Sequence, residues 1–312
     1  MHSGHERSDP VLHVDRYRRA RDHVGYGENP PPGRWPGTGA RVAISLVINI
    51  EDGAERSRSR GDDTDDIHSH WITDVPHVRG NPSLDSGYDY GARTGIWRVL
   101  RVTDAAQVPI TAFACGRALE LNPSIGEGLE RRGIEVVDHG LYWEPHGNLA
   151  LPALQQRMEE SANIIMTMTG SAPTSWYSKD GHSVASFQLM DNYDFVHDSN
   201  CFNEDMAYLP DGLAGLVTVP YSGDTNDAQL LSTMATKRQY LGQLVAALES
   251  LLEDDRPGAK VLSVGLHPRW IGRPAYAGAL KEFIARAQAM PSVVFAERRQ
   301  IAAWWKSMSL EQ

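Results

Sequence analysis

Residues 41–50 read RVAISLVINI, a continuous apolar run that is rich in β-branched residues. Such a run is typical of a strand that is buried on both faces, as strands are in parallel sheets. The run is followed directly by Glu51 and Asp52, which places two adjacent carboxylates at the end of the predicted strand. The sequence therefore predicts a parallel sheet with polar side chains at one edge.

Segments typical of helices and of buried strands alternate along the chain from residue 91 onward. The expected strands are 108–116, 134–140, 174–178, 194–200, 216–222, 260–268 and 292–296. The expected helices are 95–106, 122–133, 151–170, 183–193, 237–254, 276–290 and 298–308. This alternation predicts an α/β fold, and its unbroken repetition favours a closed barrel over an open sheet. A dinucleotide-binding fold is disfavoured, because no GxGxxG pattern follows the first strand.

The first 40 residues are polar and rich in Arg, Gly and Pro, and they end in ENPPPGRWPGTGA. We predict an N-terminal arm over residues 1–40 and a single barrel domain over residues 41–312. A disordered tail is the alternative that this composition allows. Trp35 favours an arm that is docked on the fold or on a neighbouring chain, because a lone Trp usually finds a partner surface. Residues 54–90 are polar and irregular, which predicts a long loop.

Composition limits the classes of function that the chain can have. Hydrophobic residues make up 41% of the chain and charged residues 22%, as in ordinary globular proteins. The formal net charge of −10 and the lack of a basic run disfavour nucleic-acid binding. No apolar run approaches the roughly 18 residues of a membrane span, and no secretory signal is visible, so we expect a cytoplasmic protein. Cys115 and Cys201 are expected to be ordinary thiols in a reducing compartment.

Polar residues follow most of the predicted strands. In a parallel barrel the strands end on one face, and the active sites of such barrels lie there. The residues at these ends are Asn49, Glu51, Asp52, Asp138, His139, Trp176, Tyr177, Asp198, Ser199, Tyr221, Asp224, Asn226 and His267. A single carboxylate after a strand is more often a helix cap. Carboxylates, imidazoles and amides that gather on one rim instead indicate a hydrolytic site.

Six stretches carry a resemblance to a known family: NIEDG, DHGLYW, SWYS, HDSN, VPYSGDTND and LSVGLHPRWIGRP. They resemble the polysaccharide deacetylase superfamily and, within it, the branch of the metal-independent allantoinases and related cyclic-imide hydrolases. The resemblance runs from Gly25 to Trp305, and its most specific stretches are YGARTGIWRVL and GLHPRWIGRPA. It implies a distorted barrel of the (β/α)7 type, as in polysaccharide deacetylases. It also implies hydrolysis of C–N bonds, either in acetamido groups or in cyclic ureides and imides.

The same resemblance implies roles for individual residues. Glu51 takes the place of the family's general base, and Asp52 takes the place of a metal ligand. His139 matches the first histidine of the second motif, whereas the place of the later histidine holds Trp143, as in the allantoinase-like branch. His267 follows a leucine and matches the catalytic acid. The segment SWYSKDGHS lacks the Arg-and-Pro motif of deacetylases, which disfavours a simple sugar deacetylase.

A divalent metal, with zinc as the first candidate, is a further expectation. Hydrolytic zinc takes three protein ligands and a water whose pKa it lowers. Asp52 and His139 supply two ligands, and His146 supplies the third if its loop folds back. A solvated loop position is the alternative for His146. Without a metal, Glu51, Asp52 and His267 must activate water by general-base catalysis.

We therefore expect a hydrolase of a non-peptide C–N bond in a small cyclic amide, ureide or imide. Water held by a metal, or by Glu51 and Asp52, attacks the carbonyl, and His267 protonates the leaving nitrogen. The predicted substrate-binding residues are Trp143, Trp176, Tyr177, Trp270, Asp224 and Asn226, and core packing is the alternative for the aromatic ones. The alternative functions are an N-deacetylase of N-acetylated sugars and a catalytically inactive barrel used for binding. The expected partners are a small-molecule substrate and further copies of the chain, since the resemblance implies a homo-oligomer, with a tetramer suspected.

Overall fold

The computed structural model describes residues 22–67, 80–181, 186, 189, 190, 192–210, 215–231 and 235–310. The first 21 residues of the predicted arm and much of the predicted helix 183–193 lie outside these ranges. None of the helices in the described ranges combines the length and the hydrophobicity that crossing a bilayer requires.

The strand β1 (Val42–Ile50) is the centre of a five-stranded parallel sheet and is buried along its whole length. One edge of β1 pairs with β6 (Lys260–Leu266). The other edge is shared by β7 (Val293–Phe295) and β2 (Thr111–Ala114), each of which pairs with one half of β1. The strand β3 (Glu135–Asp138) pairs with β2. The predicted α/β fold with a parallel sheet is confirmed.

A second, two-stranded parallel sheet contains β4 (His197–Asp198) and β5 (Val217–Thr218). Isolated bridges extend the main sheet at both of its ends. Trp176 bridges the last residue of β3, and Asn226 bridges Gly265 in β6. The predicted strand 174–178 is thus reduced to one bridge, and closure into a seven-stranded barrel stays a prediction.

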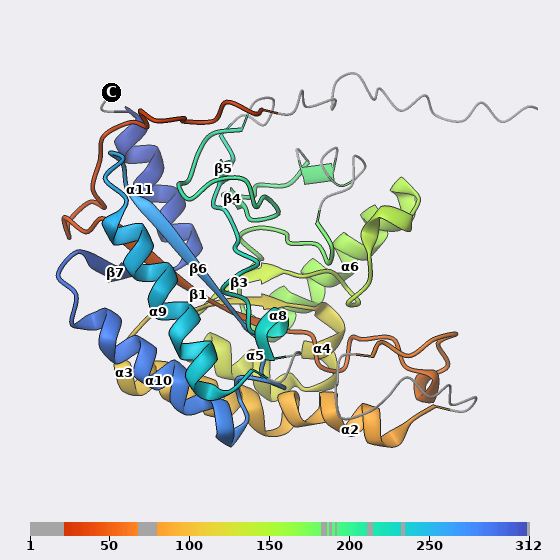
Figure 1. Cartoon of the computed structure of the whole chain (residues 1–312). Coiled ribbons are helices and arrows are strands. Elements are labelled where there is room, and N and C mark those ends of the chain that lie inside the picture. The colour runs from red at the N-terminus through yellow and green to blue at the C-terminus, as the bar shows by residue number, and fades with distance from the viewer. Residues whose placement is uncertain are drawn as a thin grey trace, which may run out of the picture.

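Helices cover the outside of the main sheet (Figure 1), and capping residues in the sequence set several of their ends. The helix α9 (Lys237–Glu253) begins after a capping box of Thr236 and Gln239. The helix α6 (Leu151–Thr169) ends at Gly170, whose φ of 69° suits a glycine. The remaining elements are η1 (Arg58–Arg60), α3 (Ile96–Ala106), α4 (Gly116–Leu121), α5 (Pro123–Glu130), η3 (His146–Asn148), α8 (Asp227–Leu231), α10 (Pro274–Gln288) and α11 (Arg298–Leu310).

The end of the expected loop 54–90 is helical, contrary to the prediction. Residues 82–90 form α2 (Pro82–Tyr90), which Asn81 caps. An Asn cap followed by Pro in the first turn is a helix-start signal, but the polar composition of the segment obscures it. The helix continues through a π-helical turn, η2 (Gly91–Gly95), into α3. Such turns are frequent at functional sites.

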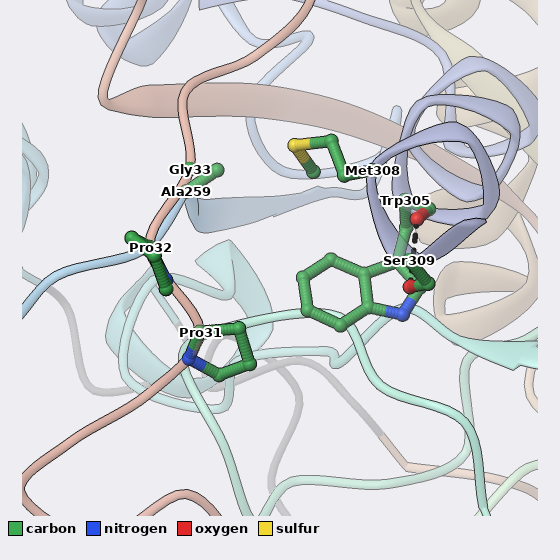
Figure 2. A pocket seen from close by; sticks show the side chains of 7 residues that line it. All are labelled: Pro31, Pro32, Gly33, Ala259, Trp305, Met308 and Ser309. Carbon is green, nitrogen blue, oxygen red and sulfur yellow. Dashed lines mark hydrogen bonds between the residues drawn. The ribbon is translucent and has the colours of Figure 1, made fainter. Parts of the chain in front are cut away.

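The described part of the arm packs against α11. Trp35 is fully buried, and its indole nitrogen donates a hydrogen bond of 2.9 Å to the carbonyl oxygen of Lys260. Its ring lies 5.7 Å from that of Trp304. Pro31, Pro32 and Gly33 of the arm face Trp305 and Met308 of α11 across a small cavity (Figure 2). Its volume is about 80 Å³. Residues 22–40 are therefore docked, and they lie where β6 begins.

The interior face of the sheet is layered, because alternate residues of a strand point to the same side. The layer nearest the amino ends of the strands is called the lower layer here. It is polar and surrounds Arg298, which donates to the hydroxyls of Ser45 and Ser263. The middle layer, or aromatic layer, consists of Val47, Phe113, Val137, Tyr177 and Tyr221. The same alternation brings Glu51 after β1 and His267 after β6 to the top of these layers. The candidate site is therefore at the carboxyl ends of the strands.

Candidate active site

Glu51 lies at the centre of the candidate site, where it contacts three other side chains, and it is 2% exposed. Its Oε1 lies 3.1 Å from Nε2 of His139 and 3.3 Å from Nε2 of His267, and its Oε2 lies 2.8 Å from Nη2 of Arg269. Burial alone would raise the pKa of Glu51. His267, Arg269 and the contact with His139 outweigh burial and hold this pKa well below its ordinary value. Glu51 is therefore ionised in the resting site.

His267 is held by a carboxylate on its far side. Its Nδ1 is 2.6 Å from Oδ1 of Asp227, and its backbone N–H donates to Oδ2 of Asp227 over 2.7 Å. Burial would lower the pKa of His267, but Glu51 and Asp227 raise it to about 9. The imidazole is therefore protonated at neutral pH, with Nε2–H directed at Glu51. This is the charge state of a general acid.

Arg269 places a buried cation against both adjacent carboxylates. Besides its contact with Glu51, its Nη1 lies 3.3 Å from Oδ1 of Asp52. The ring centroids of Tyr88 and Trp143 lie 5.2 and 5.3 Å from its Cζ, within the range of cation–π attraction. The guanidinium is thus fixed by charge and by two aromatic rings.

Asp52 is enclosed on both of its oxygens. Oδ1 faces Arg269, and Oδ2 faces Gly91, where a Cβ would collide with this oxygen. The absence of a side chain at Gly91 lets the π-helical turn approach this closely. Burial raises the pKa of Asp52 to about 7 although Arg269 opposes the shift. A pKa near 7 suits a general base, but Asp52 faces Arg269 and Gly91, whereas Oε1 of Glu51 lies 3.3 Å from the protonated His267, next to the group that can act as the acid.

His139 has a tautomer that its surroundings fix. Its Nδ1 is 3.1 Å from the carbonyl oxygen of Tyr177, which can only accept, so Nδ1 carries a hydrogen. Its Nε2 faces Oε1 of Glu51 over 3.1 Å. His139 thus forms the third side of the Glu51 environment.

The chain is similar to known proteins over most of its length. A profile of the polysaccharide deacetylase family matches residues 81–186. A Schizosaccharomyces pombe protein named as a polysaccharide deacetylase is 28% identical over 297 residues, which are 88% of this chain and 92% of that protein. A crystal structure of a probable polysaccharide deacetylase from Pseudomonas aeruginosa PAO1 is 33% identical with a TM-score of 0.85, over 93% of this chain and 98% of that one.

This chain belongs to the polysaccharide deacetylase family. The crystal structure of PuuE allantoinase is 32% identical to it with a TM-score of 0.84, again over 93% of this chain and 98% of the other. The resemblance inferred from the sequence motifs, including the allantoinase-like branch, is thereby confirmed.

The three residues predicted from the sequence to bind a metal, Asp52, His139 and His146, do not come together as a group in the structure. Asp52 is engaged by Arg269, and His139 by Glu51, while the ring of His146 is stacked on that of Trp176. Within the described ranges, no three His, Cys, Asp or Glu side chains form a group that could hold a metal ion. The guanidinium already pairs with the two carboxylates that a metal would use. The residues present therefore do not fit a metal at this position.

His146 is buried and is therefore not a solvated loop residue. Its ring is buried and stacked on that of Trp176, with centroids 4.9 Å apart and an angle of 25° between the planes. Burial lowers its pKa to about 3, so it is neutral. Neither ring nitrogen has a hydrogen-bond partner among the residues that the structure describes. His146 thus acts as an aromatic packing residue.

Only two of the four aromatic residues predicted to bind substrate lie at the site. The ring centroid of Tyr177 lies 5.0 Å from that of His139. Trp143 borders Arg269, and the ammonium group of Lys179 lies 3.5 Å from the centroid of its ring. Trp176 and Trp270 are buried within apolar clusters. Of the four aromatic residues that the sequence predicted, Tyr177 and Trp143 are therefore the two in contact with reactive groups.

The two polar residues predicted to bind substrate, Asp224 and Asn226, lie in different surroundings. Asp224 is exposed and lines a hollow of about 460 Å³ that also reaches Tyr221. Asn226 accepts a hydrogen bond from the backbone N–H of Ala228 and so caps α8. The carboxylate that reaches the site from this loop is Asp227, one residue further on.

Sequence reasoning missed two functional side chains, Asp227 and Arg269. Both lie inside stretches that carried the resemblance, VPYSGDTND and LSVGLHPRWIGRP. A carboxylate at the first position of a short helix was a signal for Asp227, because such residues face the preceding loop. Arg269 gave no comparable signal, since its contacts with Glu51 and Asp52 exist only in the folded chain.

Proposed function

We propose that this chain hydrolyses a C–N bond in a small cyclic amide, ureide or imide. The observation that carries the proposal is one buried carboxylate, Glu51, in contact with a protonated His267 and with Arg269. A base, an acid and a fixed cation within one cluster are the parts that amide hydrolysis requires. The likeness to PuuE allantoinase over nearly the whole chain supports a cyclic ureide as the substrate class.

In this proposal Glu51 accepts a proton from water while the water oxygen attacks the carbonyl carbon. His267 then gives its Nε2 proton to the leaving nitrogen, and the C–N bond breaks. Asp227 stabilises the imidazolium before this transfer, through the contact of 2.6 Å at Nδ1. The reaction leaves a proton on Glu51 and a neutral His267. Their direct contact of 3.3 Å is a path by which that proton returns to His267 and restores the site.

Arg269 stabilises the oxyanion in this proposal. Its Nε is buried and has no hydrogen-bond acceptor among the residues that the structure describes. A buried unpaired donor is costly, and at a functional site it is commonly reserved for a ligand. The charge of the guanidinium meets the negative charge that develops on the carbonyl oxygen, and the aromatic rings of Tyr88 and Trp143 hold it in place. Arg269 would thereby supply the positive charge that a metal supplies in a metal-dependent hydrolase.

The test is a panel of possible substrates: allantoin, hydantoin, succinimide, dihydrouracil and an N-acetylglucosamine oligomer. We expect ring opening of at least one cyclic compound by the purified wild type and its loss in Glu51→Gln. Glu55→Gln is a matched control, because Glu55 is also buried but bonds to Gly53 and Arg60. Acetate release from the oligomer alone would replace the proposal with N-deacetylation. Inactivity toward every compound would favour a binding role.

A further inference from the structure

Tyr221 lies in the middle layer of the interior, directly beneath the site. It is buried, and its ring packs on those of Phe113 and Tyr177, with centroids 5.8 and 5.2 Å away. The cation–π contact with Arg298 lies on the side of the lower layer, 5.7 Å from the ring. The aromatic ring is therefore fully accounted for by packing, which leaves its hydroxyl group to be explained.

Two side-chain amides point their nitrogen atoms at the Tyr221 hydroxyl. Nδ2 of Asn49 lies 3.2 Å from this hydroxyl and 3.4 Å from the carbonyl oxygen of Leu266, which can only accept. Nδ2 of Asn226 lies 3.4 Å from the hydroxyl, and its Oδ1 is fixed by the N–H of Ala228. The orientation of each amide is thus set by a second, independent partner.

The Tyr221 oxygen therefore accepts two hydrogen bonds, so its own hydrogen must point elsewhere. A tyrosine hydroxyl is one donor and an acceptor, and here the acceptor positions are filled. No acceptor for this hydrogen occurs among the residues that the structure describes. Burial raises the pKa of Tyr221, which keeps the hydroxyl protonated across the working pH range.

The hydroxyl lies one layer below the reacting groups. Asn49 precedes Glu51 by two residues, and Gly265 precedes His267 by two residues, on neighbouring strands whose register pairs Ile48 with Leu266. Gly265 must lack a side chain, because a Cβ would collide with the Tyr221 hydroxyl and lie 2.8 Å from Nδ2 of Asn226. Two residues of a strand span about 6.6 Å along the strand, so the Asn49 amide that donates to the Tyr221 hydroxyl lies one strand repeat below Glu51.

We propose that Tyr221 is a catalytic residue whose hydroxyl donates a hydrogen bond to the attacking water and holds it beneath Glu51. The inference rests on the proposed hydrolysis and assigns the position of its nucleophile. The water donates one hydrogen to Glu51 and accepts the Tyr221 hydrogen, which leaves a lone pair for the carbonyl carbon. Only the water loses a proton, to Glu51, and Tyr221 keeps its own. Holding the water in this orientation lowers the entropic part of the activation barrier.

The variant Tyr221→Phe removes only the hydroxyl. We expect kcat for the substrate identified from the panel to fall about 10- to 100-fold with KM changed by less than about threefold. Hydroxylamine added as a competing nucleophile does not depend on the held water, so the ratio of hydroxamate to hydrolysis product should rise about tenfold. An equal loss of both products, or an unchanged kcat, would overturn the inference.

The matched control is Tyr240→Phe. Tyr240 is also fully buried, and its hydroxyl has no hydrogen-bond partner within the described ranges. It lies in α9, close enough to Asp227 and Tyr221 for their electrostatic influence to reach it, but its hydroxyl bonds to neither of them. Both product rates should therefore stay within about twofold of wild type. A high-resolution crystal structure of the resting protein tests the inference without a substrate. A water bonded to both Tyr221 and Glu51, and lost in Tyr221→Phe, supports it, whereas no such water in the wild type overturns it even if the proposed hydrolysis fails.

Discussion

Two buried clusters in this fold have the same ingredients, a glutamate, a histidine and an arginine. The site cluster consists of Glu51, His139, His267 and Arg269, with Asp52 and Asp227 beside it. The lower cluster consists of Glu135, His197, Ser199 and Arg298. In the lower cluster, His197 is 3.0 Å from Glu135 and 3.2 Å from Ser199, which accepts from Nε of Arg298 over 2.7 Å. The aromatic layer separates the two clusters.

The clusters differ in how completely their polar atoms are paired. Glu135 also accepts hydrogen bonds from Thr111 and Thr174, and Arg298 bonds to hydroxyls and backbone carbonyls. In the site cluster, Nε of Arg269 has no hydrogen-bond partner among the described residues, and Oε2 of Glu51 has its ion pair with Nη2 of Arg269. A complete network stabilises a fold, whereas an incomplete one is ready for a ligand. The same residue types therefore serve structure below the aromatic layer and chemistry above it.

The arginine pKa values show the same difference. Burial lowers the pKa of Arg298 to about 10, because its partners are dipoles and aromatic rings instead of adjacent carboxylates. Burial also acts on Arg269, but Glu51 and Asp52 outweigh it and raise the pKa of Arg269. The lower cation is thus held by the fold, and the upper one by the charges that it neutralises.

The largest expected effect is that of Glu51→Gln in the site cluster. Loss of the proposed base should reduce kcat at least about 1,000-fold, because a general base typically contributes about 10²- to 10⁴-fold and this one also orients two partners. Far-UV circular dichroism should show an unchanged fold. Steady-state kinetics measures the loss, and retention of more than about a tenth of the wild-type kcat would show that the comparison assigns the wrong carboxylate.

The second effect concerns the pH dependence that Asp227 gives to His267. With the pKa of His267 raised to about 9, activity that needs the protonated acid should fall as pH rises through about 9. In Asp227→Asn one of the groups that raise this pKa is removed, so the alkaline limb should move to lower pH and kcat at neutral pH should fall about tenfold or more. A pH–rate profile measures both, and an unmoved limb would argue against His267 as the acid.

The same shift makes a stability prediction with a definite sign. The ordinary pKa of His267 is 6.5, and the folded value is about 9. Its contribution to stability is therefore fully present below pH 6.5 and is lost as pH rises through about 9. Thermal unfolding of wild type and Asp227→Asn across this interval should show the smaller pH dependence in the variant.

Glu135→Gln should have the opposite profile to Glu51→Gln. Removing the charge of this buried carboxylate, which takes part in hydrogen bonds with Thr111, Thr174 and His197, should lower the free energy of unfolding by about 3 kcal/mol. Activity per folded molecule should stay within about threefold of wild type, because the aromatic layer separates Glu135 from the substrate. The wild-type pKa of Glu135 is lowered to about 2 through His197 and other hydrogen bonds despite burial. The contribution of this carboxylate is thus present above pH 4.5 and is lost as pH falls toward about 2. Denaturant unfolding and kinetics together measure this, and a lost activity with intact stability would contradict it.

The smallest expected effect is that of metal removal. Because Arg269 already neutralises Glu51 and Asp52, treatment with a chelator followed by dialysis should leave kcat/KM within about twofold of its starting value. Added zinc should not increase it. A metal requirement, detected by loss with chelation and recovery with a stoichiometric cation, would show that Arg269 moves away from the carboxylates in the working enzyme.

The sequence predicted the fold better than it predicted the contacts of the site. The apolar run before Glu51 and the strand ahead of His267 placed both residues correctly, because hydrophobic periodicity sets which residues end a strand. Arg269 could not be inferred in this way, since its partners are 217 and 218 positions away and its direction depends on the packing of η2 against the loop that follows β6. His146 had suitable spacing for a ligand, but spacing does not determine which way a loop turns.

The docked arm has a consequence for how the chain behaves outside its native fold. Residues 22–40 cover the indole rings of α11 and seal the lower end of the interior with the hydrogen bond from Trp35. A shortened chain that began at β1 would keep every reactive group of the site and would expose a patch of tryptophan and methionine side chains. Such a patch favours self-association. We therefore expect the arm to limit self-association, and a shortened form that is meant to stay monodisperse should keep residues 22–40.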